Sequence, residues 1–249
     1  MLLPLWHRLA ACLALEQFAI HAPTTFYAKT SQSHSYGGSN EFLENIFQAL
    51  RDPQPVVRVC AADALSQCLR ILVERRVTSL TGLLCQVHFA LMEGLQQDAT
   101  VRKRPWQAIA QAEARQHGSL LVVSTMLAYT GDFVLPRYDE ICQAVLAFRD
   151  SDKALIRLEV IRLIPRLARR CPHDFGRRYL EDALCFLMHS VSTGVSSRVG
   201  VDVRPSAFTA LGQLVLAMID EKTGHLIGSS ELPTLAITRV PENPDKTIV

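Results

Sequence analysis

Residues 50–59 read LRDPQPVVRV, and residues 148–158 read FRDSDKALIRL, which is the same order of residue types with one residue inserted. In each stretch an apolar run ends, the chain turns at an aspartate, and a second apolar run begins. Asp52 and Asp150 can accept hydrogen bonds from the free N–H groups at the start of the next helix, and Pro53 fixes φ at its turn. The pattern indicates pairs of helices joined by an aspartate turn.

The apolar residues around these turns follow the i, i+3, i+4, i+7 spacing of amphipathic helices. Alternating strand patterns are nearly absent, so the sequence predicts an all-α protein. The predicted stripes are Phe42, Leu43, Ile46, Phe47 and Leu50, then Val57, Ala61, Leu65, Cys68 and Leu72; Ile141, Val145 and Phe148, then Leu155, Leu158, Ile161 and Ile164; and Leu180, Leu184, Leu187 and Val191, then Phe208, Leu211, Val215 and Met218.

One arginine near the start of each second helix gives the repeat length. Arg58 and Arg157 are each expected near the aspartate of their turn. The spacing between successive members of the set is mostly 42 to 50 residues, and units of about 40–47 residues with two helices are typical of HEAT or armadillo arrays. One step is longer, and we interpret residues 75–104 as an insertion. The marker arginines are Arg8, Arg58, Arg115, Arg157 and Arg204.

The predicted architecture is therefore a HEAT/armadillo-like α-solenoid of antiparallel helix pairs. It covers residues 1–219 with about four to five repeats, and residues 220–249 form a divergent or poorly ordered tail. Pro165 falls inside a predicted helix, where it removes a backbone hydrogen bond and is expected to bend the helix. A helical bundle without repeats is the alternative architecture.

Composition excludes several classes of protein. A net charge of +2 in 249 residues gives no reason to expect nucleic acid as a partner, and no apolar stretch approaches the roughly 20 residues of a membrane span. The seven cysteines form no Cys-x-x-Cys pair. Cys60, Cys68, Cys142 and Cys185 lie in apolar runs and are predicted to be reduced core residues of a cytoplasmic protein.

No catalytic, cofactor-binding or metal-binding set is recognisable. Asp174-Phe175-Gly176 spells the magnesium-binding tripeptide of kinases. The Gly-rich loop, anchoring lysine and catalytic loop that a kinase also needs are absent from this sequence, so we assign the tripeptide to a turn between helices. The histidines have no partner at the spacing of a zinc site. An enzyme of another class would require titratable residues that converge on a pocket.

The densest basic cluster is Arg102, Lys103 and Arg104, which Pro105 separates from Trp106. Basic residues beside an aromatic ring can bind phosphate or an acidic partner. Such a run is usually a solvated loop, and this one lies in the expected insertion. We keep the cluster as a candidate partner surface.

Several segments resemble the N-terminal HEAT region of the TOR (target of rapamycin) serine/threonine kinases. Residues 8–24 and 42–69 are similar to successive segments of that region, and residues 115–121, RQHGSLL, resemble the family's Arg-x-His-Gly-Ala-Leu-Leu helix. The most specific likeness runs from Tyr138 to Ala168. The match covers roughly residues 5–218 in order.

This resemblance implies a fragment that lacks the kinase domain, and therefore a chain that is not itself an enzyme. ATP and magnesium would bind only in the absent kinase domain, so no cofactor is expected here. The implied role is a scaffold for growth and nutrient signalling. The implied partners are the regulatory subunits of TOR complexes and the remainder of TOR, in a dimeric complex. The implied location is cytoplasmic, with attachment to endomembranes, lysosomes or vacuoles through the complex.

The alternative function is an independent HEAT-repeat adaptor for protein–protein interaction. Such an adaptor predicts regular repeats without a long step and a capping helix at both ends. The sequence shows neither feature.

Overall fold

The computed structural model describes residues 3–31, 41–75, 80–97, 105–193 and 202–219, together with Ile227. These ranges are helical almost throughout and contain no β-strand, which confirms the all-α prediction. The helices are α1 (Leu5–His21), α2 (Pro23–Ser31), α3 (Glu41–Leu50), α4 (Pro55–Glu74), α5 (Leu80–Leu95), α6 (Trp106–Tyr129), α7 (Tyr138–Leu146), α8 (Ala154–Arg170), α9 (Pro172–Arg178), α10 (Leu180–Thr193) and α11 (Arg204–Met218), with 3₁₀ turns η3 (Gly131–Phe133) and η4 (Leu135–Arg137).

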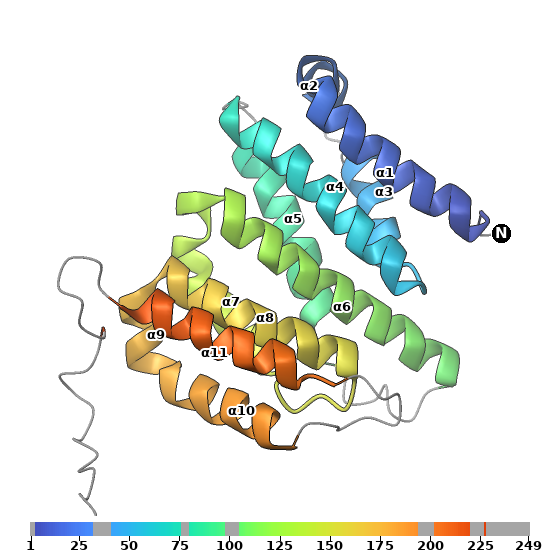
Figure 1. Cartoon of the computed structure of the whole chain (residues 1–249). Helices are drawn as coiled ribbons and strands as arrows, with labels where there is room; N and C mark the ends of the chain where they lie inside the picture. The colour runs from blue at the N-terminus through green and yellow to red at the C-terminus, as the bar shows by residue number, and fades with distance from the viewer. Residues whose placement is uncertain are drawn as a thin grey trace, which may run out of the picture.

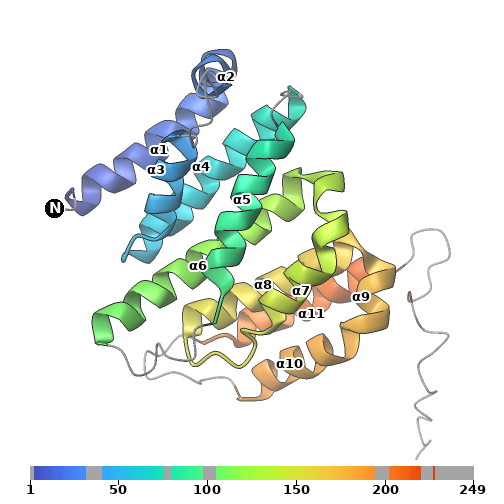
Figure 2. The same ribbon diagram turned by 180° about the vertical axis from the view of Figure 1, so that it is seen from behind.

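The helices form two layers (Figures 1 and 2). In one layer α1, α4, α6, α8 and α11 run side by side in the same direction, and each packs on the next. The other layer holds α3, α5, α7 and α10, which run in the opposite direction. The chain therefore forms an α-solenoid of antiparallel helix pairs, as the sequence predicts.

The core lies between these layers and between neighbouring helices of the first layer. On α4 the predicted stripe of Val57, Ala61, Leu65, Cys68 and Leu72 is at most 2% exposed. Burial of each large aliphatic side chain contributes about 1.5–3 kcal/mol. The apolar seam is what holds successive pairs together.

On α11 the predicted stripe is confirmed at Met218, which is buried, and at the half-buried Leu211, but it is wrong at its other two residues. Phe208 is 61% exposed and Val215 is 47% exposed. The helix is apolar around most of its circumference, so periodicity alone could not select a face, and the small residues pack against α8. The buried residues of α11 are Ala207, Ala210, Leu214, Ala217 and Met218.

Two further expectations need correction. Cys185 is exposed on α10, whereas Cys68 and Cys142 are buried as expected; burial raises the pKa of the Cys142 thiol to about 12. The tripeptide at residues 174–176 lies within the short helix α9 and not in a turn, and its phenylalanine is buried.

The range 75–104, which we interpreted as an insertion, contains the regular helix α5. This helix packs against α6, and α6 begins at Trp106, so Arg115 lies well inside it and not in its first turn. Residues 220–249, except Ile227, lie outside the described ranges, and the domain limits stay a prediction.

Nowhere in the described ranges is a helix both long and apolar enough to span a lipid bilayer.

Candidate protein-binding groove

The turn before α4 carries a buried carboxylate. The side chain of Asp52 is 4% exposed, and Arg8 of α1 binds it with two hydrogen bonds, Nε–Oδ2 at 2.6 Å and Nη2–Oδ1 at 3.1 Å. The backbone N–H of Gln54 donates to Oδ1 at 2.8 Å. Asp52 thus orders its own turn, as the sequence predicts of an aspartate there, and also fixes the preceding helix.

Arg58 connects this turn to the next pair of helices. It is 3% exposed, and its Nη1 donates to the backbone carbonyls of Asp52 (2.7 Å) and Pro53 (3.1 Å). Its Nε donates to Nδ1 of His117 on α6 at 3.0 Å. Arg58 therefore binds the backbone of the turn and not its carboxylate, which is occupied by Arg8. We call Arg8, Asp52, Arg58 and His117 the polar ladder.

His117 is a neutral member of the ladder. Burial, followed by the positive charges of Arg58 and Arg162, lowers its pKa to about 4. Since Nδ1 accepts the hydrogen bond from Arg58, the ring proton resides on Nε2. Burial also lowers the pKa of Arg58, against the opposing effects of Glu113 and Asp52. The sequence gives no sign of this role of His117, because nothing in a single sequence places it beside Arg58.

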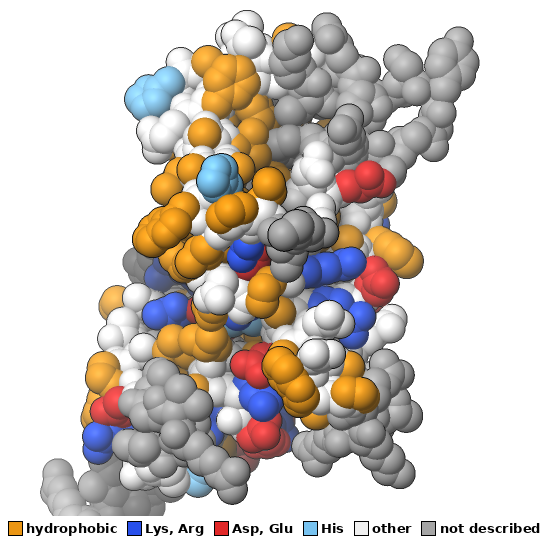
Figure 3. All heavy atoms as spheres, turned by 90° about the vertical axis from the view of Figure 1, so that its right-hand side faces the viewer, with side chains coloured by type: hydrophobic (Ala, Val, Ile, Leu, Met, Phe, Trp, Pro, Cys, Tyr) orange, Lys and Arg blue, Asp and Glu red, His pale blue; other side chains and the backbone are white. Residues whose placement is uncertain are grey.

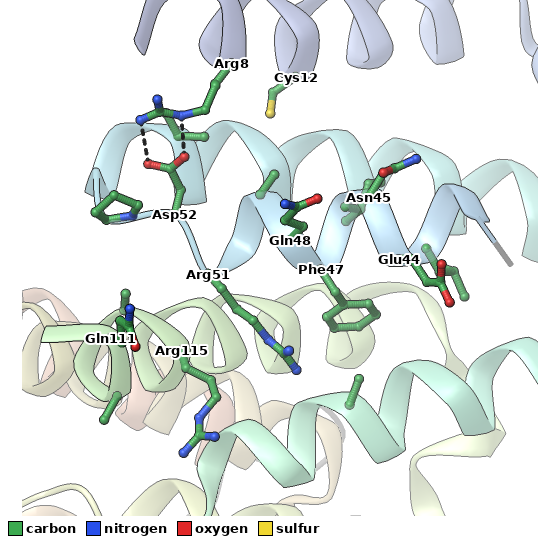
Figure 4. A pocket seen from close by; sticks show the side chains of 18 of the residues that line it. Arg8, Cys12, Glu44, Asn45, Phe47, Gln48, Arg51, Asp52, Gln111 and Arg115 are labelled. Atoms are coloured by element: carbon green, nitrogen blue, oxygen red, sulfur yellow. Dashed lines mark hydrogen bonds and ion pairs between the residues drawn. The ribbon is translucent and has the colours of Figure 1, made fainter. Parts of the chain in front are cut away.

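A groove of about 1560 Å³ lies beside the ladder, between α1, α3, α5 and α6 (Figure 4). Small-molecule pockets usually measure about 300–1,000 Å³, so the size suits a peptide segment. Two aromatic side chains on its lining are largely exposed, Phe89 at 72% and Trp106 at 74%. Phe47 of α3 extends toward α5 in the same view.

Polar groups accompany these aromatic residues. Arg51, which directly follows α3, pairs with Glu93 of α5 at 3.5 Å, and both side chains are about half exposed. Nε of Arg115, which also lines the groove, is buried and makes no hydrogen bond with any residue described. Gln48 and Gln111 add amide groups. An apolar surface with a few amide and guanidinium donors can bind an extended or helical peptide.

The structure brings some of the predicted positions together at the groove. Asp52, Pro53, Arg115 and Trp106 all line it, and Arg58 lies behind them in the ladder. Arg102, Lys103 and Arg104 of the candidate partner surface lie outside the described residues.

The remaining predicted positions lie elsewhere. The side chain of Asp150 is 87% exposed, and its neighbour Arg149 approaches it at 3.5 Å. Arg157 is half-buried in the first turn of α8, and Pro165 is buried inside that helix. Arg204 begins α11 and pairs with Asp202 at 2.9 Å.

Figure 3 faces the edge of the solenoid where α1, α4, α6 and α8 begin. Hydrophobic side chains gather on the part of this edge formed by the N-terminal helices. Lysine, arginine and acidic side chains lie across its middle and lower parts. Among the described residues, no group of three or more His, Cys, Asp or Glu side chains could hold a metal ion; that the protein needs no cofactor stays a prediction.

Comparison with known proteins finds relatives along most of the chain. It is 33% identical over 221 residues to the serine/threonine-protein kinase TOR of Arabidopsis thaliana, which is 89% of this chain and 8% of that protein. It is 29% identical over 221 residues to TOR of Oryza sativa subsp. japonica and 28% identical over 220 residues to tor1 of Schizosaccharomyces pombe, again 8% of each. No protein-family model matches the sequence. The chain thus spans about 8% of the length of these relatives.

Proposed function

Because this chain belongs to the TOR kinase family as a homologue of one segment of those proteins, we propose that it is a non-catalytic HEAT-repeat scaffold. In this proposal it supports the assembly of a TOR-type complex in growth and nutrient signalling. The observation that carries the proposal is the match of 89% of the chain to one segment, 8% of the length, of a TOR kinase. The solenoid fold supports it, since stacked helix pairs present long faces to protein partners.

We further propose that the groove is where this scaffold receives a protein segment. Its volume exceeds that of a small-molecule pocket, and Phe89 and Trp106 offer aromatic anchors of the kind that dominate protein interfaces. The polar ladder holds α1, α4 and α6 in register around it. The partners that this proposal implies are the regulatory subunits of TOR complexes and other parts of TOR itself.

The test is a chimera in which this chain replaces the matching segment of S. pombe tor1. If the chain is a TOR scaffold, the chimera keeps the subunits that co-purify with the parent kinase and keeps its protein kinase activity. A chimera that is as abundant as the parent but loses those subunits would contradict the proposal. The independent adaptor predicts that second outcome.

The groove is tested within the same chimera. Phe89→Asp together with Trp106→Asp places charge on the aromatic anchors, and the expected result is loss of at least one co-purifying subunit. The matched control is Met188→Asp, which changes a 58%-exposed apolar side chain on α10, away from the groove. Equal subunit recovery in both variants would exclude the groove as a binding site.

A further inference from the structure

The second half of α8 is buried except along one line. From Glu159 to Ala168 only Arg162 and Arg166 are exposed, and Arg169 continues the same line one turn later. Residues spaced by four and three positions lie on one face of a helix. The entire solvent face of this part of α8 is therefore arginine. We call Arg162, Arg166 and Arg169 the arginine stripe.

Two of the three arginines of the stripe are not neutralised by the residues that the structure describes. Arg162 pairs with Glu159 at 2.7 Å, whereas Arg166 and Arg169 make no ion pair with any residue that the structure describes. The helices that flank α8 in its layer are α6 and α11. From Ala114 onward α6 has no acidic residue, and α11 has none at all.

Ordinary helix electrostatics accounts for only part of this arrangement. The partial negative charge at a helix C-terminus stabilises a cation in the last turn, which includes Arg169. Arg162 and Arg166 lie earlier, and like charges four residues apart destabilise a helix. Alternating acidic and basic residues would give an equally soluble face without that repulsion.

The neighbouring surface suggests the chemistry of a partner. On α11, which packs beside α8, Phe208 and Leu216 are 61% and 69% exposed, so the neighbouring helix carries exposed apolar side chains. A phosphate backbone makes no use of such apolar surface, whereas an amphipathic peptide contacts both kinds of group. The observations therefore favour a protein segment over nucleic acid.

We infer that the arginine stripe binds an acidic, helical segment of a protein partner. Carboxylates at positions i, i+4 and i+7 of that segment would match the three guanidinium groups, which span about 10 Å of helix. Apolar residues beside them would contact α11. The inference rests on the proposed scaffold function and adds the chemistry of one partner at a site separate from the groove.

The first experiment measures binding of a defined probe to the 249-residue chain. The probe is a labelled helical peptide of about 20 residues with glutamates at i, i+4 and i+7, and the comparison peptide has glutamines there. We expect fluorescence anisotropy to show binding of the glutamate peptide that weakens with salt, and little binding of the glutamine peptide. Equal binding of the two peptides would overturn the inference.

Charge reversal locates the site. Arg166→Glu with Arg169→Glu should weaken binding by about tenfold or more. The matched control, Arg149→Glu with Arg204→Glu, changes the net charge equally at side chains that are 39% and 50% exposed, and should change binding by less than about threefold. Circular dichroism checks that both variants fold. An equal loss in both pairs would show that only net charge matters, and would contradict a site on α8.

Two further measurements distinguish a protein partner from other ligands of the stripe, and failure of the stripe from failure of the scaffold proposal. If single-stranded RNA or phosphatidylserine vesicles bind more tightly than the peptide, with the same dependence on Arg166 and Arg169, the inference of a protein partner is wrong. In the tor1 chimera, Arg166→Glu with Arg169→Glu should release a subunit that the control pair retains. Full retention there, in a chimera that otherwise assembles, would refute the stripe alone, whereas failure of the unmodified chimera would refute the scaffold function.

Discussion

The turns at Asp52 and Asp150 have nearly the same sequence and different structural roles. Asp52 is buried, and it binds both its own turn and Arg8 of the preceding helix. Asp150 is exposed and approaches only the adjacent Arg149. The difference arises because α1 presents an arginine over the first turn. At the second turn the preceding helix α6 presents Glu113 instead, which pairs with Lys153 of the turn at 3.6 Å.

The arginines that follow the two turns differ in the same way. Arg58 is buried and joins three segments, whereas Arg157 is only half-buried. A repeated motif therefore specifies where a helix begins, but the groups on neighbouring repeats decide whether its polar residues become part of the core. The half of the solenoid from α1 to α6 has the buried polar ladder between its helices. In the half from α7 to α11 the hydroxyl of Tyr138 donates to the backbone carbonyl of Leu167 at 2.7 Å, and Arg149 and Asp182 pair at exposed positions.

Substitution of the paired arginines should produce the largest contrast. Arg58→Ala removes the donors of three hydrogen bonds and leaves buried acceptors on His117 and on two carbonyls. We therefore expect a loss of about 4 kcal/mol in the free energy of unfolding. Arg157→Ala should cost about 1 kcal/mol or less. Urea unfolding monitored by circular dichroism measures both. Similar losses would show that the two turns are equivalent after all.

The pH dependence of the free energy of unfolding should report on His117 in the polar ladder. The pKa of His117 is about 4 in the folded chain and about 6.5 in the unfolded chain, so only the unfolded state takes up the proton between these values. The contribution of His117 to the free energy of unfolding is therefore fully present above pH 6.5. It is lost as the pH decreases toward 4, by about 3 kcal/mol in total.

The measurement is the urea midpoint between pH 4 and 7 for the unmodified chain and for His117→Gln, in which the side-chain amide can still accept from Arg58. The variant should lack this part of the pH dependence. His189→Gln, at an exposed position on α10, should retain it. A profile for His117→Gln that parallels the unmodified chain would contradict the role assigned to His117.

Alanine substitutions at two glycines test how closely neighbouring helices pack in each half of the solenoid. A Cβ at Gly118 of α6 would lie 2.0 Å from the carbonyl oxygen of Leu50, at the end of α3. Gly118→Ala must therefore displace backbone, and should lower stability by about 2 kcal/mol. A Cβ at Gly212 of α11 would meet no atom within 4 Å. Gly212→Ala should raise the free energy of unfolding by about 0.5–1 kcal/mol, because alanine favours helix. Thermal unfolding should therefore show a lower midpoint for Gly118→Ala and a higher midpoint for Gly212→Ala. An unchanged midpoint for Gly118→Ala would contradict the close packing of α3 and α6.

The local sequence determined the helices and most of their buried faces. On α4 the spacing of Val57, Leu65 and Leu72 correctly identified buried residues, although Leu69 and Ile71 outside the predicted stripe are buried too. On α11 the spacing assigned two exposed residues to the buried face, because Phe208 and Val215 are as apolar as the residues that pack. The longer step between the marker arginines Arg58 and Arg115 was ambiguous for a similar reason. A longer pair of helices and an insertion lengthen a repeat equally.

What the sequence by itself determined is the class of fold, the direction change at each aspartate turn and the likeness to TOR kinases. These depend on residues that are close together along the chain or on their order. Only the tertiary structure decided the pairing of Asp52 with Arg8, the neutral state of His117 and the groove. Each depends on groups that are brought together from different helices, and no spacing along the chain encodes which of them meet.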